Sequence, residues 1–71
     1  MMTKIEQLRK TLNLTQKELA QKIGVSESAI SAYESRRRSP CARILKNLSF
    51  LLNKIEPPLG LTIEDILMDY K

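Results

Sequence analysis

The feature that most constrains this chain is a pair of short amphipathic segments separated by only three residues. In "LTQKELAQKIG", Thr15 and Glu18 have capping-box spacing, which predicts a helix that ends at Gly24. In "VSESAISAYE", Ser26 is a favourable N-cap for a second helix. Two short helices joined by a glycine-containing turn of this length predict a helix-turn-helix over about residues 15–34.

Start and stop signals predict a helix on each side of this pair. Thr3 is a suitable N-cap for the first helix, and Asn13, which tolerates a left-handed backbone, is a suitable end. Ser39 and Pro40 are expected to open a fourth helix as its N-cap and first residue. The apolar stripe of that helix continues to Ile55.

A fifth helix is predicted near the C-terminus. Pro57 and Pro58 should stop the fourth helix, and Gly60 should turn the chain. Thr62, with an aspartate three residues later, should cap the last helix, whose apolar face extends to Tyr70. With no alternating β-branched pattern that would favour strands, the sequence predicts an all-α fold of five helices in a single domain, residues 1–71.

The charge is distributed unevenly along the chain. Residues 1–54 carry eleven Lys or Arg and four Glu, a net charge of +7, whereas residues 55–71 carry one Lys and four acids, a net charge of −3. A concentrated basic surface favours a polyanion partner, most often a nucleic acid.

Other features exclude several classes of function. The chain contains no histidine, no apolar run near 18 residues, no phosphate-binding glycine loop and one cysteine, Cys41. We therefore expect a cytoplasmic protein that is not an enzyme, with no metal, cofactor, membrane or small-molecule ligand. The adjacent Glu64 and Asp65 are interpreted as helix-capping acids rather than an acid–base pair. Cys41 is either a redox-sensitive thiol at a helix start or a small inert residue, and we favour the second interpretation.

The stretch "LRKTLNLTQKELAQKIGVSESAISAYE" resembles the lambda-repressor-like family of helix-turn-helix domains, the phage repressor and Cro (XRE) type. The resemblance extends from about Ile5 to Leu67 and implies a compact five-helix DNA-binding domain whose third helix enters the major groove. It also implies a buried ion pair between Arg9 and Glu34. Together with the arginine run, it predicts these DNA-binding residues: Gln16, Lys17, Ser26, Glu27, Ser28, Ser31, Ala32, Arg36, Arg37 and Arg38.

Several of these residues have an ordinary structural alternative. Gln16 matches the family's phosphate-contacting glutamine, and we favour that role over a simple surface residue. Lys17 should point outward and meet the DNA backbone. Ser28 and Ser31 are either small surface residues or, as we favour, contacts to bases or phosphates. Glu27 either stabilises the helix dipole or accepts a hydrogen bond from a cytosine amino group, and the sequence does not separate these two roles.

Ala32 either packs on a thymine methyl group or makes room for the DNA. The three arginines of "YESRRRSP" follow the third helix directly, and we favour phosphate contact over a merely solvated loop. The family usually has a glycine where Arg36 stands. Because a left-handed arginine is costly, the loop is expected to follow a path different from the family's. The link "NKIEPPLG" is also longer than usual, which leaves the docking of the last helix open.

The sequence thus predicts a sequence-specific transcriptional regulator. A repressor of phage, prophage or mobile-element type, bound to palindromic operator double-stranded DNA as a homodimer, is the favoured function. The alternative is an antitoxin-like or adaptor protein that uses the same fold mainly to bind another protein. An exposed apolar patch around Leu59, Leu61, Ile63 and Tyr70 would favour that alternative.

Overall fold

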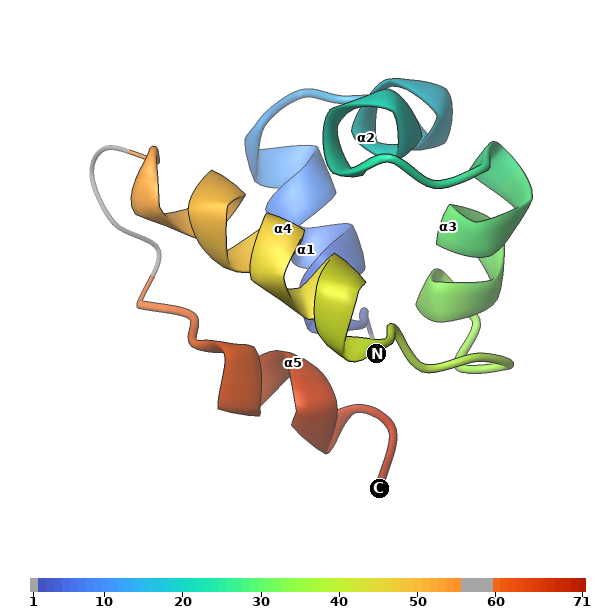
Figure 1. The fold of residues 1–71 in the computed structure, drawn as a ribbon, viewed down its shortest axis with the longest axis vertical. Helices are drawn as coiled ribbons and strands as arrows, with labels where there is room; N and C mark the ends of the chain where they lie inside the picture. Colours follow the sequence, from blue (N-terminus) through green and yellow to red (C-terminus); the bar gives the residue numbers. More distant parts are fainter. Residues whose placement is uncertain (1, 56–59) are drawn as a thin grey trace.

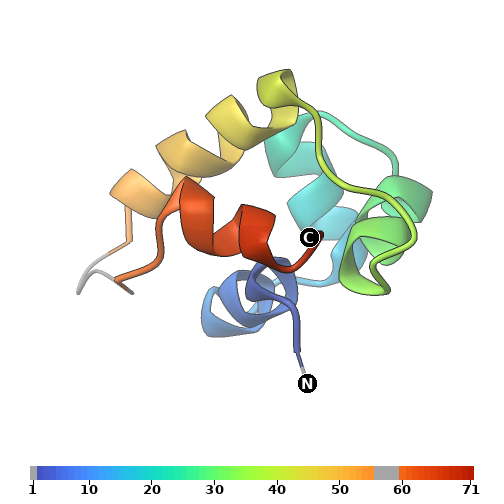
Figure 2. The ribbon, with the colours of Figure 1, turned by 90° about the horizontal axis from the view of Figure 1, so that it is seen from below.

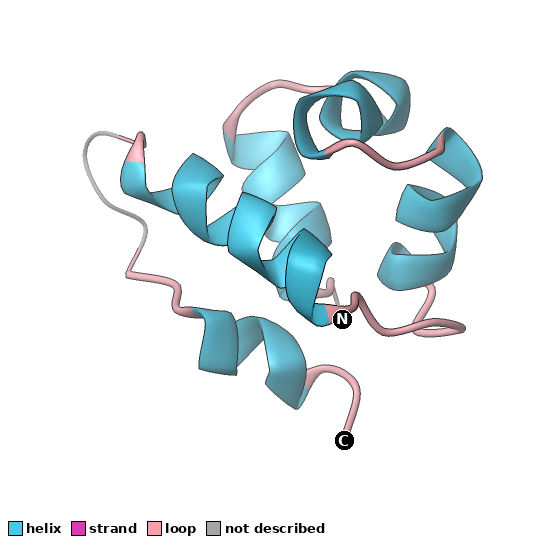
Figure 3. Ribbon diagram, viewed as in Figure 1, coloured by secondary structure: helices cyan, strands magenta, loops and turns pink. Residues whose placement is uncertain are grey.

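Five helices and their connections account for the whole of the computed structural model, which describes residues 2–55 and 60–71 (Figure 1). These residues contain no strand (Figure 3), so the predicted all-α fold is confirmed. The helices are α1 (Lys4–Thr11), α2 (Gln16–Ile23), α3 (Glu27–Glu34), α4 (Ala42–Asn53) and α5 (Ile63–Met68).

The helices surround one apolar core and leave one face of α3 uncovered. The most extensive helix–helix contact joins α2 and α3, while α1 packs against α3 and α5, and α4 packs against α2 and α5. Figures 1 and 2 both show α5 lying beside α4, and Figure 1 shows α2 at the opposite end of the molecule from α5. The core contains buried side chains from every helix: Ile5, Leu8, Leu19, Ala20, Ile23, Ala29, Ile30, Tyr33, Ile44, Leu48 and Ile66.

Four of the five helices have the N-cap that the sequence predicts, directly before their first residue. In each case a side-chain hydroxyl accepts a hydrogen bond from the amide three residues later, which satisfies one of the unpaired amides of the first turn. The caps and their donors are Thr3 with Glu6, Thr15 with Glu18, Ser26 with Ala29, and Thr62 with Asp65. The two predicted capping boxes, at Thr15 and Thr62, are both complete.

Each of the first three helices is followed, within two residues of its last residue, by a residue with a left-handed backbone. These residues are Asn13 (φ 59°), Gly24 (φ 75°) and Arg36 (φ 63°). At the end of α3, Arg36 N–H donates to Tyr33 O at 3.2 Å and Arg37 N–H donates to Ala32 O at 2.9 Å. These two hydrogen bonds form a Schellman motif.

The expectation that Arg36 would avoid a left-handed backbone is therefore wrong. The arginine itself adopts this conformation, in which glycine has no steric penalty. Two hydrogen bonds of the Schellman motif oppose the steric penalty of its Cβ. An ion pair adds to them, because Arg36 Nη2 lies 3.8 Å from Asp69 Oδ1.

This conformation predicts different stabilities for two substitutions of Arg36. Both Arg36→Gly and Arg36→Ala remove the guanidinium, but only glycine relieves the left-handed backbone. We expect the glycine variant to have the larger free energy of unfolding, by about 1 kcal/mol. Urea denaturation of the two variants measures this difference, and equal stabilities would contradict the backbone argument.

The predicted bounds of α4 are wrong at both ends. The helix begins at Ala42 with Cys41 as its N-cap, rather than with Ser39 and Pro40, and no side chain caps it. Pro40 is buried, so its ring belongs to the loop that leads into the helix. The helix ends at Asn53 and does not reach Ile55, because the amide of Lys54 turns back to the carbonyls of Leu51 and Leu52.

The last helix is also shorter than predicted. It ends at Met68, so Tyr70 lies beyond it rather than on its apolar face. The chain turns left-handed at Gly60, as predicted (φ 75°). The predicted stop at Pro57 and Pro58 lies outside the described residues.

Candidate nucleic-acid interface

The uncovered face of α3 carries short polar side chains. Glu27 and Ser28 are exposed and Ser31 is half-buried, while Ile30 and Tyr33 point into the core. This division follows the helical period, since the outward residues recur at spacings of three and four. The outward face is therefore narrow and offers a carboxylate and two hydroxyls for recognition.

Two residues at the edges of this face have structural tasks. The hydroxyl of Ser26 accepts the amide of Ala29 at 3.1 Å, so it caps α3. Ala32 is 7% exposed, and its carbonyl accepts the amides of Arg37 and Arg38. So small an exposed area favours the interpretation that Ala32 makes room for the DNA, and its contact with a thymine methyl group stays a prediction.

Arg9 and Glu34 form an ion pair between α1 and the end of α3. Arg9 Nε lies 2.6 Å from Glu34 Oε2, and Arg9 Nη2 lies 3.2 Å from Glu34 Oε1, so the contact is bidentate. The side chains are 14% and 7% exposed. Arg9 Nη1 also donates to the carbonyl of Leu14 at 2.9 Å, which ties the α1–α2 connection to the same pair. The hydrogen bond to Glu34 raises the pKa of Arg9 above its ordinary value, so the guanidinium stays charged.

Gln16 joins this pair from the start of α2. Its Nε2 donates to Glu34 Oε1 at 3.0 Å. The contact holds the Gln16 side chain against the end of α3, so the first turn of α2 and the end of α3 are linked through one carboxylate. An amide nitrogen carries two N–H donors, so Gln16 has a second one for an outside acceptor.

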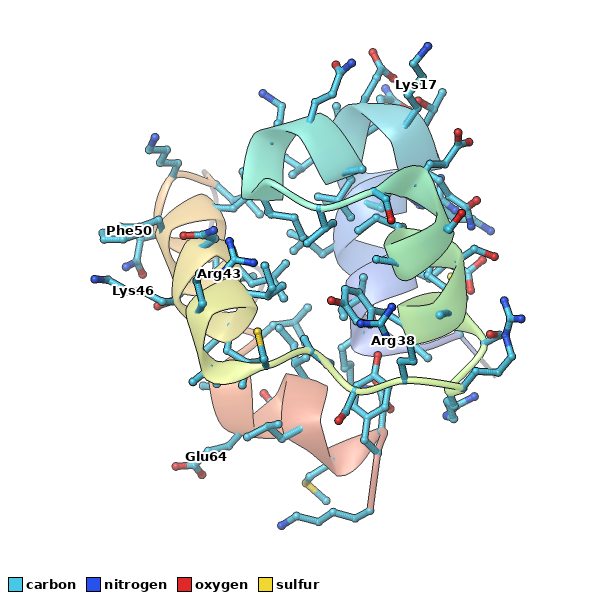
Figure 4. All side chains as sticks on the ribbon, turned by 45° about the vertical axis from the view of Figure 1, so that its right-hand side comes forward. Lys17, Arg38, Arg43, Lys46, Phe50 and Glu64 are labelled. Carbon is cyan, nitrogen blue, oxygen red and sulfur yellow. The ribbon has the colours of Figure 1, made fainter. Side chains whose placement is uncertain are left out.

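Basic side chains lie at both ends of the outward face of α3. Lys17 is exposed at the start of α2, and the three arginines of the loop are all exposed. Figure 4 shows Lys17 and Arg38 at opposite ends of α3. Arg37 Nε donates to the hydroxyl of Ser35 at 2.9 Å, and Arg36 faces Asp69, so Arg38 carries the least constrained guanidinium of the three.

Two long-range contacts that sequence analysis missed hold the ends of the paired helices. Asn47 Nδ2 of α4 donates to Ile23 O at the end of α2, at 3.0 Å. Tyr70 Oη donates to Tyr33 O near the end of α3, at 2.7 Å. Nothing in the local sequence signals either contact, because both partners lie more than twenty residues away.

Burial, followed by the nearby Asp69 carboxylate, raises the pKa of Tyr70 from 10.0 to about 12. The folded chain therefore holds the phenolic proton more tightly than the unfolded chain. The contribution to stability is complete below pH 10 and is lost as the pH rises towards 12. We expect Tyr70→Phe to lose less of its unfolding free energy than the wild type between about pH 9 and about pH 11.5. Urea titrations at the two pH values measure the difference, and parallel losses would contradict it.

Three other predicted features lie away from α3. Cys41 is exposed, and the backbone amide of Ile44 lowers the pKa of its thiol. Asp65 accepts the amide of Thr62 at 3.0 Å, which confirms it as a helix-capping acid, and Glu64 is exposed in the same first turn. Within residues 2–55 and 60–71, no three His, Cys, Asp or Glu side chains gather as metal ligands. No helix in the described part of the chain is long and apolar enough to span a membrane.

Comparison with known proteins identifies the family. Residues 5–58, more than half of the chain, match the family model described as helix-turn-helix (HTH_3). The chain matches no curated protein and no solved structure. The chain therefore belongs to the helix-turn-helix family of the lambda-repressor-like, XRE type, whose members are DNA-binding transcription regulators.

Proposed function

We propose that this protein is a sequence-specific repressor of phage, prophage or mobile-element type, with α3 as the helix that enters the major groove. The observation that carries the proposal is the narrow polar face of α3, with basic side chains at both of its ends. Such a face fits the groove, while the cations reach the two phosphate backbones beside it. The net charge of +7 over residues 1–54 supports the same partner.

Phosphate contacts are assigned to the ends of this surface. Gln16 and Lys17 act from the first turn of α2, where the helix dipole also favours an anion. Arg37 and Arg38 act from the loop after α3. Arg36 contributes less, because its guanidinium faces Asp69.

Base contacts are assigned to the middle of the surface. Ser28 and Ser31 are short enough for a close approach, and a hydroxyl pairs with either a donor or an acceptor. Glu27 accepts a hydrogen bond from a cytosine amino group and repels phosphates that approach in a wrong register. Ser26 caps α3 through its hydroxyl oxygen, and its O–H can still donate to a phosphate.

The protein is proposed to bind palindromic operators as a homodimer, with residues 1–71 acting as one domain. The two α3 helices then lie about one turn of DNA, ~34 Å, apart. Repression follows from occupying the promoter.

Selection of bound duplexes from random DNA, together with sizing of the free and bound protein, tests this function. We expect an enriched sequence with two-fold symmetry and two chains per duplex. A salt titration on the enriched duplex should show affinity falling steeply with salt. Enrichment of no sequence would contradict sequence-specific repression, and salt-independent affinity would contradict phosphate binding.

A second candidate function is an antitoxin-like or adaptor protein. It is favoured by apolar side chains near α5, where Met68 is 65% exposed and Leu61, Ile63 and Tyr70 are half-buried. Leu59, the remaining member of the predicted patch, lies outside the described residues. A homodimer that buries Met68 in solution would remove this support, whereas a free protein that stays monomeric with Met68 exposed would strengthen it.

A further inference from the structure

The end of α3 is held by the C-terminal segment of the chain, which lies outside the residues matched by the family model. Tyr70 Oη donates to Tyr33 O at 2.7 Å across 37 residues of sequence. Asp69 Oδ1 lies 3.8 Å from Arg36 Nη2. Two consecutive residues after α5 therefore contact the last turn of α3 and the residue with a left-handed backbone that follows it.

Asp69 is itself fixed from the other side. Its Oδ2 accepts the amide of Lys4 at 2.6 Å, at the start of α1. The carboxylate is 13% exposed and links three parts of the chain: the start of α1, the end of α5 and the loop after α3. This arrangement gives Arg36 an immobile partner.

Tyr70 acts on the hydrogen bonds that shape the loop. The Tyr33 carbonyl that it contacts also accepts the amide of Arg36 at 3.2 Å. The next carbonyl towards the N-terminus, that of Ala32, accepts the amides of Arg37 and Arg38 at 2.9 Å and 3.3 Å. The hydroxyl of Tyr70, by holding the Tyr33 carbonyl in place, therefore also holds the acceptor of the Arg36 amide, at which the loop begins.

We propose that Tyr70 and Asp69 are positioning residues for DNA binding, which hold the loop Arg36–Arg38 in the conformation that meets the phosphate backbone. The proposal rests on the proposed function, because it requires that this loop touches DNA. Ordering a loop in advance removes an entropic cost that binding would otherwise carry. The two residues need not contact DNA themselves.

This role differs measurably from a direct phosphate contact. A variant that lacks the Tyr70 hydrogen bond still places the same arginines on the same phosphates once bound, so it releases the same number of counterions. We therefore expect weaker affinity with an unchanged slope of log K against log salt. Loss of an arginine, in contrast, changes both the affinity and the slope.

Tyr70→Phe and Asp69→Asn test the proposal, with Ile44→Val as the matched control. The control removes one buried methyl group from α4, so it lowers stability without touching the loop. Affinity for a duplex is measured at several salt concentrations, at a temperature at which circular dichroism shows every variant folded. Hydrogen exchange of the Arg37 and Arg38 amides is measured on the free proteins.

We expect Tyr70→Phe to bind about five-fold more weakly at every salt concentration, which is the loss of one net hydrogen bond. The Arg37 and Arg38 amides should exchange about five-fold faster, while α4 amides such as that of Leu48 change less. Asp69→Asn should speed the exchange of the same two amides; its affinity is not compared, because the substitution also removes a negative charge beside Arg36. Ile44→Val should bind as the wild type does.

Two results would overturn the inference. One is unchanged affinity of Tyr70→Phe together with unchanged exchange at Arg37 and Arg38 in both Tyr70→Phe and Asp69→Asn. The other is an equal loss of affinity in Ile44→Val, which would assign the effect to general stability. Failure of the wild type to bind any duplex would instead contradict the proposed function, so the two failures are distinguishable.

Discussion

Replacing Glu34 by alanine is expected to lower the free energy of unfolding by about 3 kcal/mol. The substitution leaves Arg9, which is 14% exposed, without its bidentate partner, and it also removes the acceptor of Gln16. Stability of about 4–10 kcal/mol is usual for a chain of this length, so the loss is a large fraction of the total. Urea denaturation of the wild type and the variant measures it.

A double-mutant cycle with Arg9→Ala separates the pair from its surroundings. We expect a coupling free energy of about 2 kcal/mol between Arg9 and Glu34, so that the double variant is little worse than either single variant. The matched control is Glu6→Ala, because Glu6 pairs with Lys10 at 3.1 Å on the exposed side of the same helix. Its expected cost is below about 0.5 kcal/mol. Additive effects at Arg9 and Glu34 would contradict the interpretation of the pair as one unit.

Replacing both Arg37 and Arg38 by alanine is expected to weaken DNA binding about thirty-fold at ~0.15 M salt, or about five-fold for each arginine. The physical reason is that each lost phosphate contact retains one counterion on the DNA. The slope of log K against log salt should become shallower by about 0.9 for each arginine. Competition titrations on the selected operator and on an unrelated duplex measure both quantities.

The loss should be the same for both duplexes, because phosphate contacts carry no sequence information. Lys46→Ala is the matched control. Figure 4 shows Lys46 on the side of α4 that points away from α3, so removing this cation, which is also exposed, should leave the slope unchanged. A changed preference between duplexes would mean that the loop reads bases, and an effect as large for Lys46 would place the DNA elsewhere.

Local chemistry explains why most of the fold was predictable. A hydroxyl cap acts over three residues, so the sequence alone predicts the caps Thr15 and Ser26. A left-handed turn after a helix depends on one residue, so it also predicts Asn13 and Gly24. Reliance on local signals also explains the wrong start of α4. Ser39 and Pro40 together are typical of a helix start, but Pro40 is buried in the loop before the helix.

The parts that could not be predicted depend on distant partners. Arg36 adopts a left-handed backbone conformation, which residue preferences alone do not predict for arginine. Two hydrogen bonds at the end of α3 and the ion pair with Asp69 stabilise it. The helical period places Ala32 on the outward face, yet it is 7% exposed, and its carbonyl accepts amides of the following loop. The sequence predicts Tyr70 on the apolar face of the last helix, whereas its hydroxyl donates to the Tyr33 carbonyl near the end of α3. Long-range contacts of this kind leave no periodic signal in the sequence.

The central claim is that DNA binds at the outward face of α3 and its two basic ends. Amide chemical shifts of the isotope-labelled protein, recorded while a selected duplex is added, test this claim most directly. The account predicts the largest changes at Gln16, Lys17, Ser28, Ser31 and the loop 36–38, with small changes on the outer faces of α4 and α5. Changes centred on Phe50 or Met68, with α3 unaffected, would contradict it.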